Sequence, residues 1–399
     1  MGKNGRYGKD YGKVVGKDSP SRPGWKGPGY VKKPEPPAKA KAKTSSPESL
    51  NVASEPVIPI ELQQLLLEIF RNTFPEILAA DTLQSMLQDV KTALYDRDFS
   101  RAFGKPEFLT AYSVRWSPSR ALCYLSILAG IQELLAQLMC LDAEEQEDLS
   151  SSSTRKSSLK VVCFGGGAAE VIAFGGFLKF LHNTMSTDTT VAEKLVNLSL
   201  SASDPGINLH LVDAAQWGDA VQMLSSGLHT PPPLSKYASS AAREANSALL
   251  PAGSITTTFQ ANDVLDLSQD HLIDITGKRP ILLTLFFTLN ELYAASIGKT
   301  TALLLKLTLV AKPGTLLLVV DSPGSYSETT VGKDAKKYPI QWLLDHALLE
   351  TEKSRGEEST ASWRKLFSDD SRWFRLPDGL RYPIPLENMR YQISLYQRL

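Results

Sequence analysis

The chain has 399 residues, 42% of them hydrophobic and 22% charged, with a formal net charge of zero at pH 7, which suits one large folded domain or two ordinary ones. Three cysteines, Cys123, Cys140 and Cys163, show no paired spacing, and the five histidines are scattered, which argues against a disulfide scaffold or a metal site and for a reducing compartment. The N-terminus lacks the apolar run of a secretory signal, and the apolar runs 281–289 and 302–310 are too short to span a bilayer, so no membrane segment is expected.

The zero net charge hides a basic segment at the N-terminus. Residues 1–44 contain 12 Lys and Arg against 3 Asp and Glu, a net charge of +9, whereas the remainder of the chain carries −9. Residues 1–55 are rich in Gly, Pro and Lys and cannot bury enough apolar surface to fold alone, which predicts a disordered basic tail. Aromatic residues interleaved with charge are typical of segments that contact nucleic acid. A solubilising or nuclear-targeting tail is the alternative, and the two roles are compatible.

A helical region is predicted over residues 56–145. Residues 59–74 and 79–94 both repeat apolar residues at helical spacing. A Ser-Pro pair, typical of a helix start, precedes residues 119–141, and this stretch predicts one long, mostly buried helix.

After a Ser-rich linker over residues 146–158, the pattern changes to short apolar runs separated by helices, within a domain over residues 159–399. The runs that predict strands are 159–166, 207–215, 255–265, 280–293 and 312–326. Strands alternating with helices, such as the helix predicted over 300–311, favour a parallel, doubly wound sheet. The run 389–399 alternates apolar and polar residues, which predicts a half-buried edge strand, antiparallel to the others. Loops or insertions are predicted over 183–206, 225–253 and 327–337.

The first predicted strand turns into a helix through Gly165, Gly166 and Gly167. Because N–H groups at a helix N-terminus attract a carboxylate or phosphate, these glycines are the first candidates for ligand contact. The loop is not a P-loop, since no Gly-Lys-Ser/Thr ends it. Nor does it fit G-x-G-x-x-G, since Glu170 takes the place of the last glycine and would repel a pyrophosphate. S-adenosylmethionine carries no pyrophosphate, and an acidic side chain near its ammonium or sulfonium is tolerated, so Glu170 also belongs to the expected cofactor site.

Polar residues at the next strand ends fit the same ligand. Asp213 can accept hydrogen bonds from both ribose hydroxyls, and Asn262 and Asp263 can pair with the adenine edge. Asp213 follows Gly167 by 46 residues, whereas a compact unit places the acid about 20 residues on, so an insertion is expected between them. A helix cap at Asp213 and a turn at Asn262 are the structural alternatives. These residues favour a methyltransferase over a nicotinamide-dependent oxidoreductase.

Six segments spread along the chain carry a family resemblance. They are VVCFGGGAAEVIAF, YSVRWSPSRALCY, LTLFFTLNELY, LLVVDSPGSYSE, DSRWFRLP and PIPLENMRYQISLYQRL. Together, over roughly residues 57–399, they resemble the fungal large-subunit (25S) ribosomal RNA uridine-N3 methyltransferases. The resemblance implies a class I methyltransferase fold, with a Rossmann-like, mostly parallel seven-stranded sheet. The loop departs from the acidic-x-Gly-x-Gly-x-Gly pattern of such enzymes, with Cys163 in the acidic place and Ala169 in that of the last glycine.

The same resemblance implies a substrate, a partner and a compartment. S-adenosylmethionine is the expected methyl donor and a uridine in ribosomal RNA the expected acceptor, with a pre-ribosomal particle as partner. The nucleus or nucleolus is the expected location, with the cytoplasm as the alternative. A non-catalytic ribosome-assembly factor that keeps the fold and binds pre-ribosomal RNA is the alternative to an enzyme.

Candidate catalytic residues follow the fourth and fifth strands. The uridine N3 proton is weakly acidic, and its removal leaves an anion that can attack the methyl group in line. Asn290 could hydrogen-bond the uracil edge, and Glu291 or Asp321 could take the proton. A first-turn acid that favours the helix dipole is the alternative for Glu291, and turn chemistry in Asp-Ser-Pro-Gly is the alternative for Asp321.

Candidate RNA contacts are arginines beside aromatic residues, because these pair with phosphates and stack on bases. They are Arg115, Trp116, Arg120, Arg372, Trp373 and Arg375. An extruded uridine needs such a stacking wall, since N3 lies on its pairing edge. Core packing is the alternative for both tryptophans.

Overall fold

The computed structural model describes residues 56–144, 157–187, 205–324, 326–331, 334–349 and 362–399. The predicted basic tail, most of the predicted linker and most of the predicted insertion over 183–206 lie outside the described residues. The described residues all belong to one compact unit.

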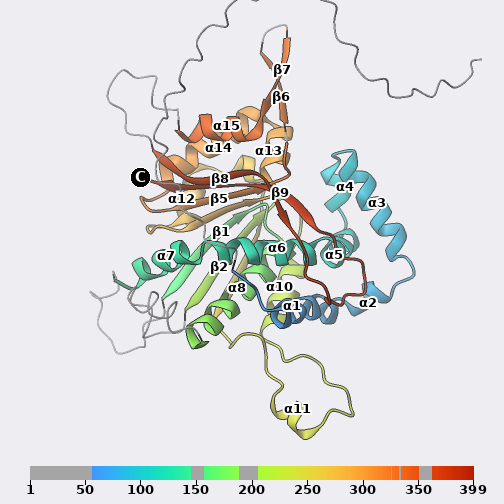
Figure 1. Ribbon diagram of the computed structural model, residues 1–399. Helices are drawn as coiled ribbons and strands as arrows, with labels where there is room; N and C mark the ends of the chain where they lie inside the picture. Colours follow the sequence, from blue (N-terminus) through green and yellow to red (C-terminus); the bar gives the residue numbers. More distant parts are fainter. Residues whose placement is uncertain (1–55, 145–156, 188–204, 325, 332–333, 350–361) are drawn as a thin grey trace, which may run out of the picture. The chain divides into compact units, whose positions relative to one another are not determined.

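A seven-stranded sheet with the strand order β3-β2-β1-β4-β5-β9-β8 lies at the centre of this unit (Figure 1). Its strands are β1 (Ser158–Phe164), β2 (Gly206–Asp213), β3 (Ile255–Ala261), β4 (Leu282–Phe286), β5 (Leu316–Asp321), β8 (Trp363–Phe374) and β9 (Met389–Arg398). Strands β1 to β5 pair in parallel, whereas β9 is antiparallel to both β5 and β8. The order reverses between β1 and β4, as in doubly wound sheets, so the predicted fold class is confirmed.

Two layers of helices cover the two faces of the sheet (Figure 1). The helices that precede the sheet in sequence are α1 (Ile60–Thr73), α2 (Pro75–Ala79), α3 (Leu83–Tyr95), α4 (Phe99–Phe103), α5 (Pro106–Arg115), α6 (Ser117–Gly130) and α7 (Gln132–Glu144). Of these, α6 and α7 pack with α8 (Ala168–Thr187) and α10 (Gly218–Leu228) on one face of the sheet, and α1 and α5 pack against these helices. The other face is covered by α12 (Gln269–Thr276), α13 (Leu289–Ala295), α14 (Ile297–Val310) and α15 (Ile340–Leu349).

Five predictions of local structure were wrong. The run 389–399, predicted as a half-buried edge strand, is β9, which is antiparallel as expected but is an interior strand between β5 and β8 and is mostly buried. The single helix over 119–141 is broken at Ile131 into α6 and α7, which are bent by 70°, because Gly130 weakens a helix interior. The loop over 327–337 contains a hairpin of β6 (Tyr326–Val331) and β7 (Asp334–Pro339). The strand predicted over 280–293 ends at Phe286, and α13 follows it. Because strand and helix are both apolar, the sequence pattern does not mark the boundary between them. The loop over 225–253 contains the end of α10 and the short α11 (Ser240–Glu244).

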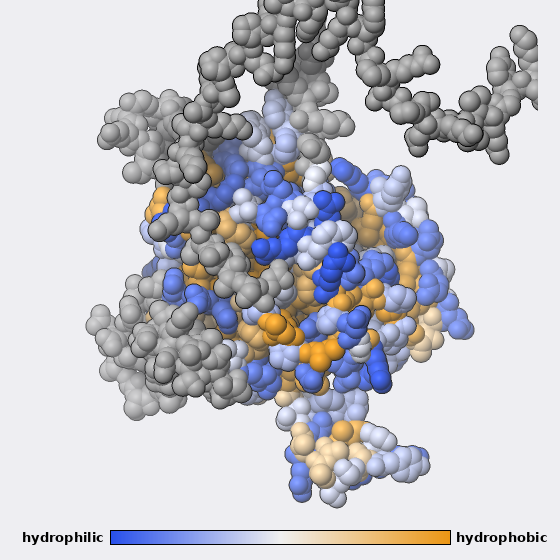
Figure 2. Space-filling view, in the orientation of Figure 1, coloured by the Kyte–Doolittle hydropathy of each residue, from blue (hydrophilic) through white to orange (hydrophobic). Residues whose placement is uncertain are grey.

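Within the described residues, no helix is by itself both long enough and apolar enough to cross a membrane, and only the bent pair α6–α7 meets that criterion jointly. On the face that Figure 2 presents, hydrophilic and hydrophobic residues are interspersed.

The connection between β8 and β9 lies against the N-terminal helices (Figure 1). Gln64 on α1 donates through Nε2 to the Arg381 carbonyl at 3.1 Å and accepts the Arg381 N–H through Oε1 at 2.9 Å. The Glu387 N–H donates to Ser119 Oγ at 3.1 Å, and the Glu387 carboxylate forms an ion pair with Arg115. The last two strands of the sheet are therefore attached to the helices that begin the fold.

The N-terminal helices share one hydrophobic core with α8. Leu66 on α1 and Leu125 on α6 are fully buried against Gly176 in the middle of α8. A Cβ at Gly176 would lie 2.6 Å from Leu66 Cδ1 and 3.2 Å from Leu125 Cδ2. The missing side chain is therefore what lets α1 and α6 approach α8 so closely.

Replacing Gly176 by valine tests this packing. We expect Gly176→Val to lower the free energy of unfolding by about 1–3 kcal/mol, because the added methyl groups overfill the contact. Gly298→Val is the matched control, since Gly298 is exposed in the first turn of α14 and a Cβ there meets nothing within 4 Å. Urea unfolding measures both variants, and equal effects would contradict the shared core.

Candidate active site

Two cavities lie at the carboxyl ends of β1 to β4, where doubly wound sheets bind ligands. The inner cavity has a volume of about 60 Å³ and the outer cavity about 510 Å³. Both are lined by Phe103, Gly165, Asp213, Thr288 and Glu291, so we treat them as one site. A groove of about 560 Å³ between α1, α8 and α10 is larger, but the acidic residues at the strand ends do not line it.

The glycine loop between β1 and α8 is bonded and packed within the protein. Gly165 has a φ of +75°, its N–H donates to the Val212 carbonyl at 2.8 Å, and a Cβ would lie 2.2 Å from Thr288 Oγ1. The Gly167 N–H donates to Glu170 Oε2 at 2.8 Å. Gly166 packs against the Cys163 and Leu211 side chains and lines neither cavity. The glycines thus let the β1 and β4 loops meet, and two of their N–H groups already have acceptors.

Glu170 stands in the first turn of α8 and is 4% exposed. Burial raises the pKa of Glu170, whereas the hydrogen bond from Gly167 and the charge of Arg120 act against that rise. The carboxylate occupies the position at the helix N-terminus where the sequence predicts ligand contact.

Asp213 ends β2 and lines both cavities. Its Oδ1 accepts the Ala215 N–H at 2.7 Å. Burial raises the pKa of Asp213 to about 7; the charge of Glu170 adds to the rise, and hydrogen bonds from Ala215 and Trp217 oppose it. The Asp213 carboxyl group therefore lies where the two cavities meet, and with a pKa of about 7 it changes its protonation state near neutral pH.

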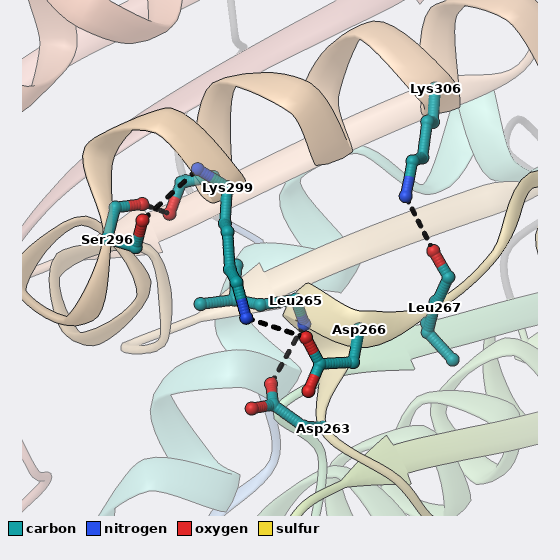
Figure 3. A network of polar contacts seen from close by, with 8 residues as sticks. Asp263, Leu265, Asp266, Leu267, Ser296, Lys299 and Lys306 are labelled. Carbon is teal, nitrogen blue, oxygen red and sulfur yellow. Dashed lines mark hydrogen bonds and ion pairs between the residues drawn. The ribbon is translucent and has the colours of Figure 1, made fainter.

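The connection after β3 forms a wall of the outer cavity, and Figure 3 shows the polar contacts within this connection and to α14. Asp263 Oδ1 accepts the Leu265 N–H at 2.9 Å and starts the short helix η3 (Val264–Asp266). Lys299 on α14 donates to Asp266 Oδ1 at 2.8 Å, which ties this wall to α14. Asp263 lines the outer cavity, whereas Asn262 is exposed, accepts from the Gln260 side chain at 2.9 Å and lines neither cavity.

The three candidate catalytic residues have different surroundings. Glu291, in the first turn of α13, lines both cavities, and burial raises its pKa to about 8, a rise that Arg120 opposes and Asp213 and Asp321 increase. Asp321 is 2% exposed, and its two oxygens accept the Asn290 N–H at 2.8 Å and the Ser322 N–H at 2.7 Å. Burial raises the pKa of Asp321 to about 6. Neither Asn290 nor Asp321 is among the described residues that line the two cavities.

Phe287 lines the inner cavity in a conformation that sequence reasoning did not anticipate. Its φ is +54°, which is rare for a bulky residue and costs on the order of 1–3 kcal/mol. The Phe287 N–H donates to the Val320 carbonyl at 2.7 Å, and the ring is stacked with Tyr124, with centroids 6.3 Å apart. Tyr112 and Tyr124, which open and close the segment YSVRWSPSRALCY, also line this cavity. The family resemblance of that segment was the sequence feature that could have identified both tyrosines as site residues.

The candidate RNA contacts occupy three different places. Arg120 lines the inner cavity. Arg115 pairs with Glu387, and its Cζ lies 5.6 Å from the ring centroid of Trp116, which is partly buried against the core. At the end of β8, Trp373 is 50% exposed, with Arg375 Cζ at 5.3 Å from its ring and Arg372 Nε at 3.5 Å from Asp369 Oδ2.

Comparisons with known proteins agree on one chemistry. Residues 70–397 match the family model described as "Putative SAM-dependent methyltransferase". The chain is 33% identical, over 341 residues, to the 25S rRNA (uridine(2843)-N(3))-methyltransferase of Saccharomyces cerevisiae, with 84% of this chain and 85% of the yeast protein covered.

Solved structures similar to this chain include two methyltransferases. A SAM-dependent methyltransferase from Methanosarcina mazei is 9% identical, with a TM-score of 0.32, and the match covers 62% of this chain and 95% of that one. An O-methyltransferase family protein from Burkholderia thailandensis is 12% identical, with a TM-score of 0.30 and coverage of 79% and 70%. At such TM-scores these overlays carry no argument, and the strand order alone defines the fold.

Alanine at Gly165 should disrupt the site. The positive φ disfavours a side chain, and the Cβ would collide with Thr288. We expect Gly165→Ala to weaken S-adenosylhomocysteine binding by roughly tenfold or more, because the β1 and β4 loops must separate, a strain of 1–3 kcal/mol or so. Gly324→Ala is the matched control, since Gly324 also has a positive φ, +71°, but a Cβ there meets nothing within 4 Å. Similar calorimetric affinities for the two variants would contradict the role of the contact.

The raised pKa of Glu291 predicts a pH dependence of stability. The stability that the protonated Glu291 carboxyl contributes is complete below its ordinary pKa of 4.5, declines as the pH rises, and is lost above about 8. Glu291→Gln keeps an uncharged side chain at every pH. From pH 5 to pH 8.5 its free energy of unfolding should therefore rise relative to that of wild type by roughly 1–3 kcal/mol, which melting temperatures measured at each pH will detect. A difference in melting temperature that does not change with pH would show that Glu291 ionises freely in the fold.

Proposed function

The chain belongs to the S-adenosylmethionine-dependent methyltransferase family, and from this premise we propose that it methylates N3 of a uridine in large-subunit ribosomal RNA. The observation that carries the proposal is the 33% identity, over most of both chains, to a yeast protein named for that reaction on 25S rRNA. A pre-ribosomal particle in the nucleus or nucleolus is then the proposed partner and location.

The residues of the two cavities fit S-adenosylmethionine. Val264, Leu265 and Leu292 give the outer cavity apolar walls that suit an adenine ring, and the Asp213 carboxylate beside them suits a ribose diol. Glu170 and Glu291 line the inner cavity and favour the cationic sulfonium and ammonium groups. When bound, S-adenosylmethionine supplies a methyl group on a positively charged sulfur, which is open to attack by a nucleophile.

Glu291 is the residue that we propose accepts the N3 proton. A general base acts best when its pKa is close to the working pH, and burial raises the pKa of Glu291 to about 8. Asp321 is less suited, because both of its oxygens already accept backbone N–H groups, and the bond from Asn290 attaches α13 to β5. The Asn290 N–H donates to Asp321, so Asp321 holds the backbone of Asn290 in place. Any contact of the Asn290 side chain with the uracil edge therefore depends on this bond.

A stacking surface for RNA is proposed at the end of β8. Strand β8 runs parallel to β5, and its Phe374 pairs with Met389 at the start of β9, so Trp373 and Arg375 lie at the same edge of the sheet as the cavities. The half-exposed indole of Trp373 and the guanidinium beside it suit an unpaired base and its phosphate.

The proposal is tested by the modification itself. Large-subunit RNA from cells that lack the protein should contain less N3-methyluridine than RNA from wild-type cells, measured by nucleoside mass spectrometry against a synthetic standard. Wild-type protein should restore the modification. Undiminished N3-methyluridine at every site, mapped by primer-extension arrest, would rule the assignment out.

The same strain tests the proposed base. Glu291→Gln should fail to restore N3-methyluridine, and in vitro should lower kcat by about 100-fold or more, because proton removal loses its acceptor. Glu107→Gln is the matched control, since Glu107 is also a first-turn acid but is exposed on α5 and lines neither cavity. Full activity of Glu291→Gln would leave Glu291 with a helix-dipole role only.

A further inference from the structure

Arg120 is a cation held inside the acidic inner cavity. It projects from the first turns of α6, and its Cζ lies 4.9 Å from the ring centroid of Phe287 and 5.4 Å from that of Tyr112. The guanidinium lies over the faces of these rings, which hold it by cation–π attraction. The rings do not accept the hydrogen bonds that its N–H groups can donate in the guanidinium plane. Within the described part of the chain, the guanidinium has no hydrogen-bond acceptor or ion-pair partner. Its five N–H donors are therefore available to a ligand.

The N-terminus of α8 also lines the inner cavity, and a side chain already occupies it. The N-terminus of α8 attracts negative charge, but the Glu170 carboxylate accepts the Gly167 N–H there. The Gly165 N–H donates to the Val212 carbonyl. A ligand carboxylate at this loop would thus meet bonded N–H groups and the like charge of Glu170.

The charges that line the cavity favour different positions for the ammonium and the carboxylate at the amino-acid end of the cofactor. Glu170, Asp213 and Glu291 line the inner cavity and attract its cationic groups. Arg120 is the one Lys or Arg among the described residues that line this cavity. Planar guanidinium and planar carboxylate can form two parallel hydrogen bonds, which a point charge cannot match.

We propose that Arg120 binds the carboxylate at the amino-acid end of S-adenosylmethionine. A residue of the N-terminal helical region would then complete the cofactor site, and the RNA contact expected for Arg120 from its sequence context would be wrong. The inference takes from the proposed function only the identity of the methyl donor. Its test uses no RNA, so it can fail while the uridine assignment stands, and the reverse.

Two ligands that differ by the carboxylate alone test the proposal. S-adenosylhomocysteine has the amino-carboxylate end, and S-adenosyl-3-thiopropylamine keeps the amine but lacks the carboxylate. Calorimetry on the wild-type chain should show S-adenosylhomocysteine binding more tightly by roughly 10- to 100-fold, the range for a charged hydrogen-bonded pair. Equal affinities in the wild type would overturn the proposal without any variant.

Arg120→Met should remove this difference. We expect its affinity for S-adenosylhomocysteine to fall by roughly 10- to 100-fold and its affinity for the decarboxylated compound to change by less than about threefold. Arg120→Lys keeps the charge without the planar fork and should fall between the two. Arg115→Met is the matched control, because Arg115 also lies beside an aromatic ring but pairs with Glu387 and lines neither cavity.

The pattern of losses decides the outcome. A parallel loss for both ligands in Arg120→Met would assign Arg120 to the adenosine end or to the shape of the cavity, and would overturn the proposal. Unchanged binding of both ligands would also overturn it and would return Arg120 to an RNA-binding role.

Discussion

The candidate site is organised by acidic side chains that the fold brings together in a largely buried region. Parallel strands place their carboxyl ends at one edge, so Asp213 and Asp321 converge there, and the first turns of α13 and α8 add Glu291 and Glu170. Burial opposes their ionisation, and each charge opposes the next. Arg120 favours the charged forms of Glu170, Glu291 and Asp321. The protonation states of this edge therefore belong to the group as a whole, and a bound cation changes them together.

This organisation places the N-terminal helices at the candidate site. They could be regarded as an addition to a complete sheet domain, since they precede it in sequence. Yet Tyr112 and Arg120 line the inner cavity, and Leu66 packs into the middle of α8. The helices thus supply a wall of the inner cavity and a positive charge that lowers the pKa of its acids, and their packing in the core fixes where that charge lies.

Some of this arrangement follows from the sequence and some does not. The glycine loop and Asp213 were predicted because a strand end followed by glycine or an acid marks the binding edge of a doubly wound sheet. The bend at Ile131 was missed, because apolar periodicity continues across it. The location of Arg120 could not be derived, since an arginine four residues after a tryptophan has the same local pattern on a surface and in a cavity. Phe287 was missed for a related reason: a positive φ in a bulky residue is imposed by tertiary contacts, and nothing in the local sequence calls for it.

The position of β9 has a consequence for how the chain folds. β9 lies between β5 and β8, although it follows both in the sequence, so β8 has no partner strand in the sheet until β9 has been synthesised. The bonds from Gln64 to Arg381, which join residues 317 positions apart, form at the same late stage. Contacts of such sequence separation slow folding. The edge of β5 therefore has no partner strand until β9 has been synthesised, and an unpaired strand edge is a template for aggregation.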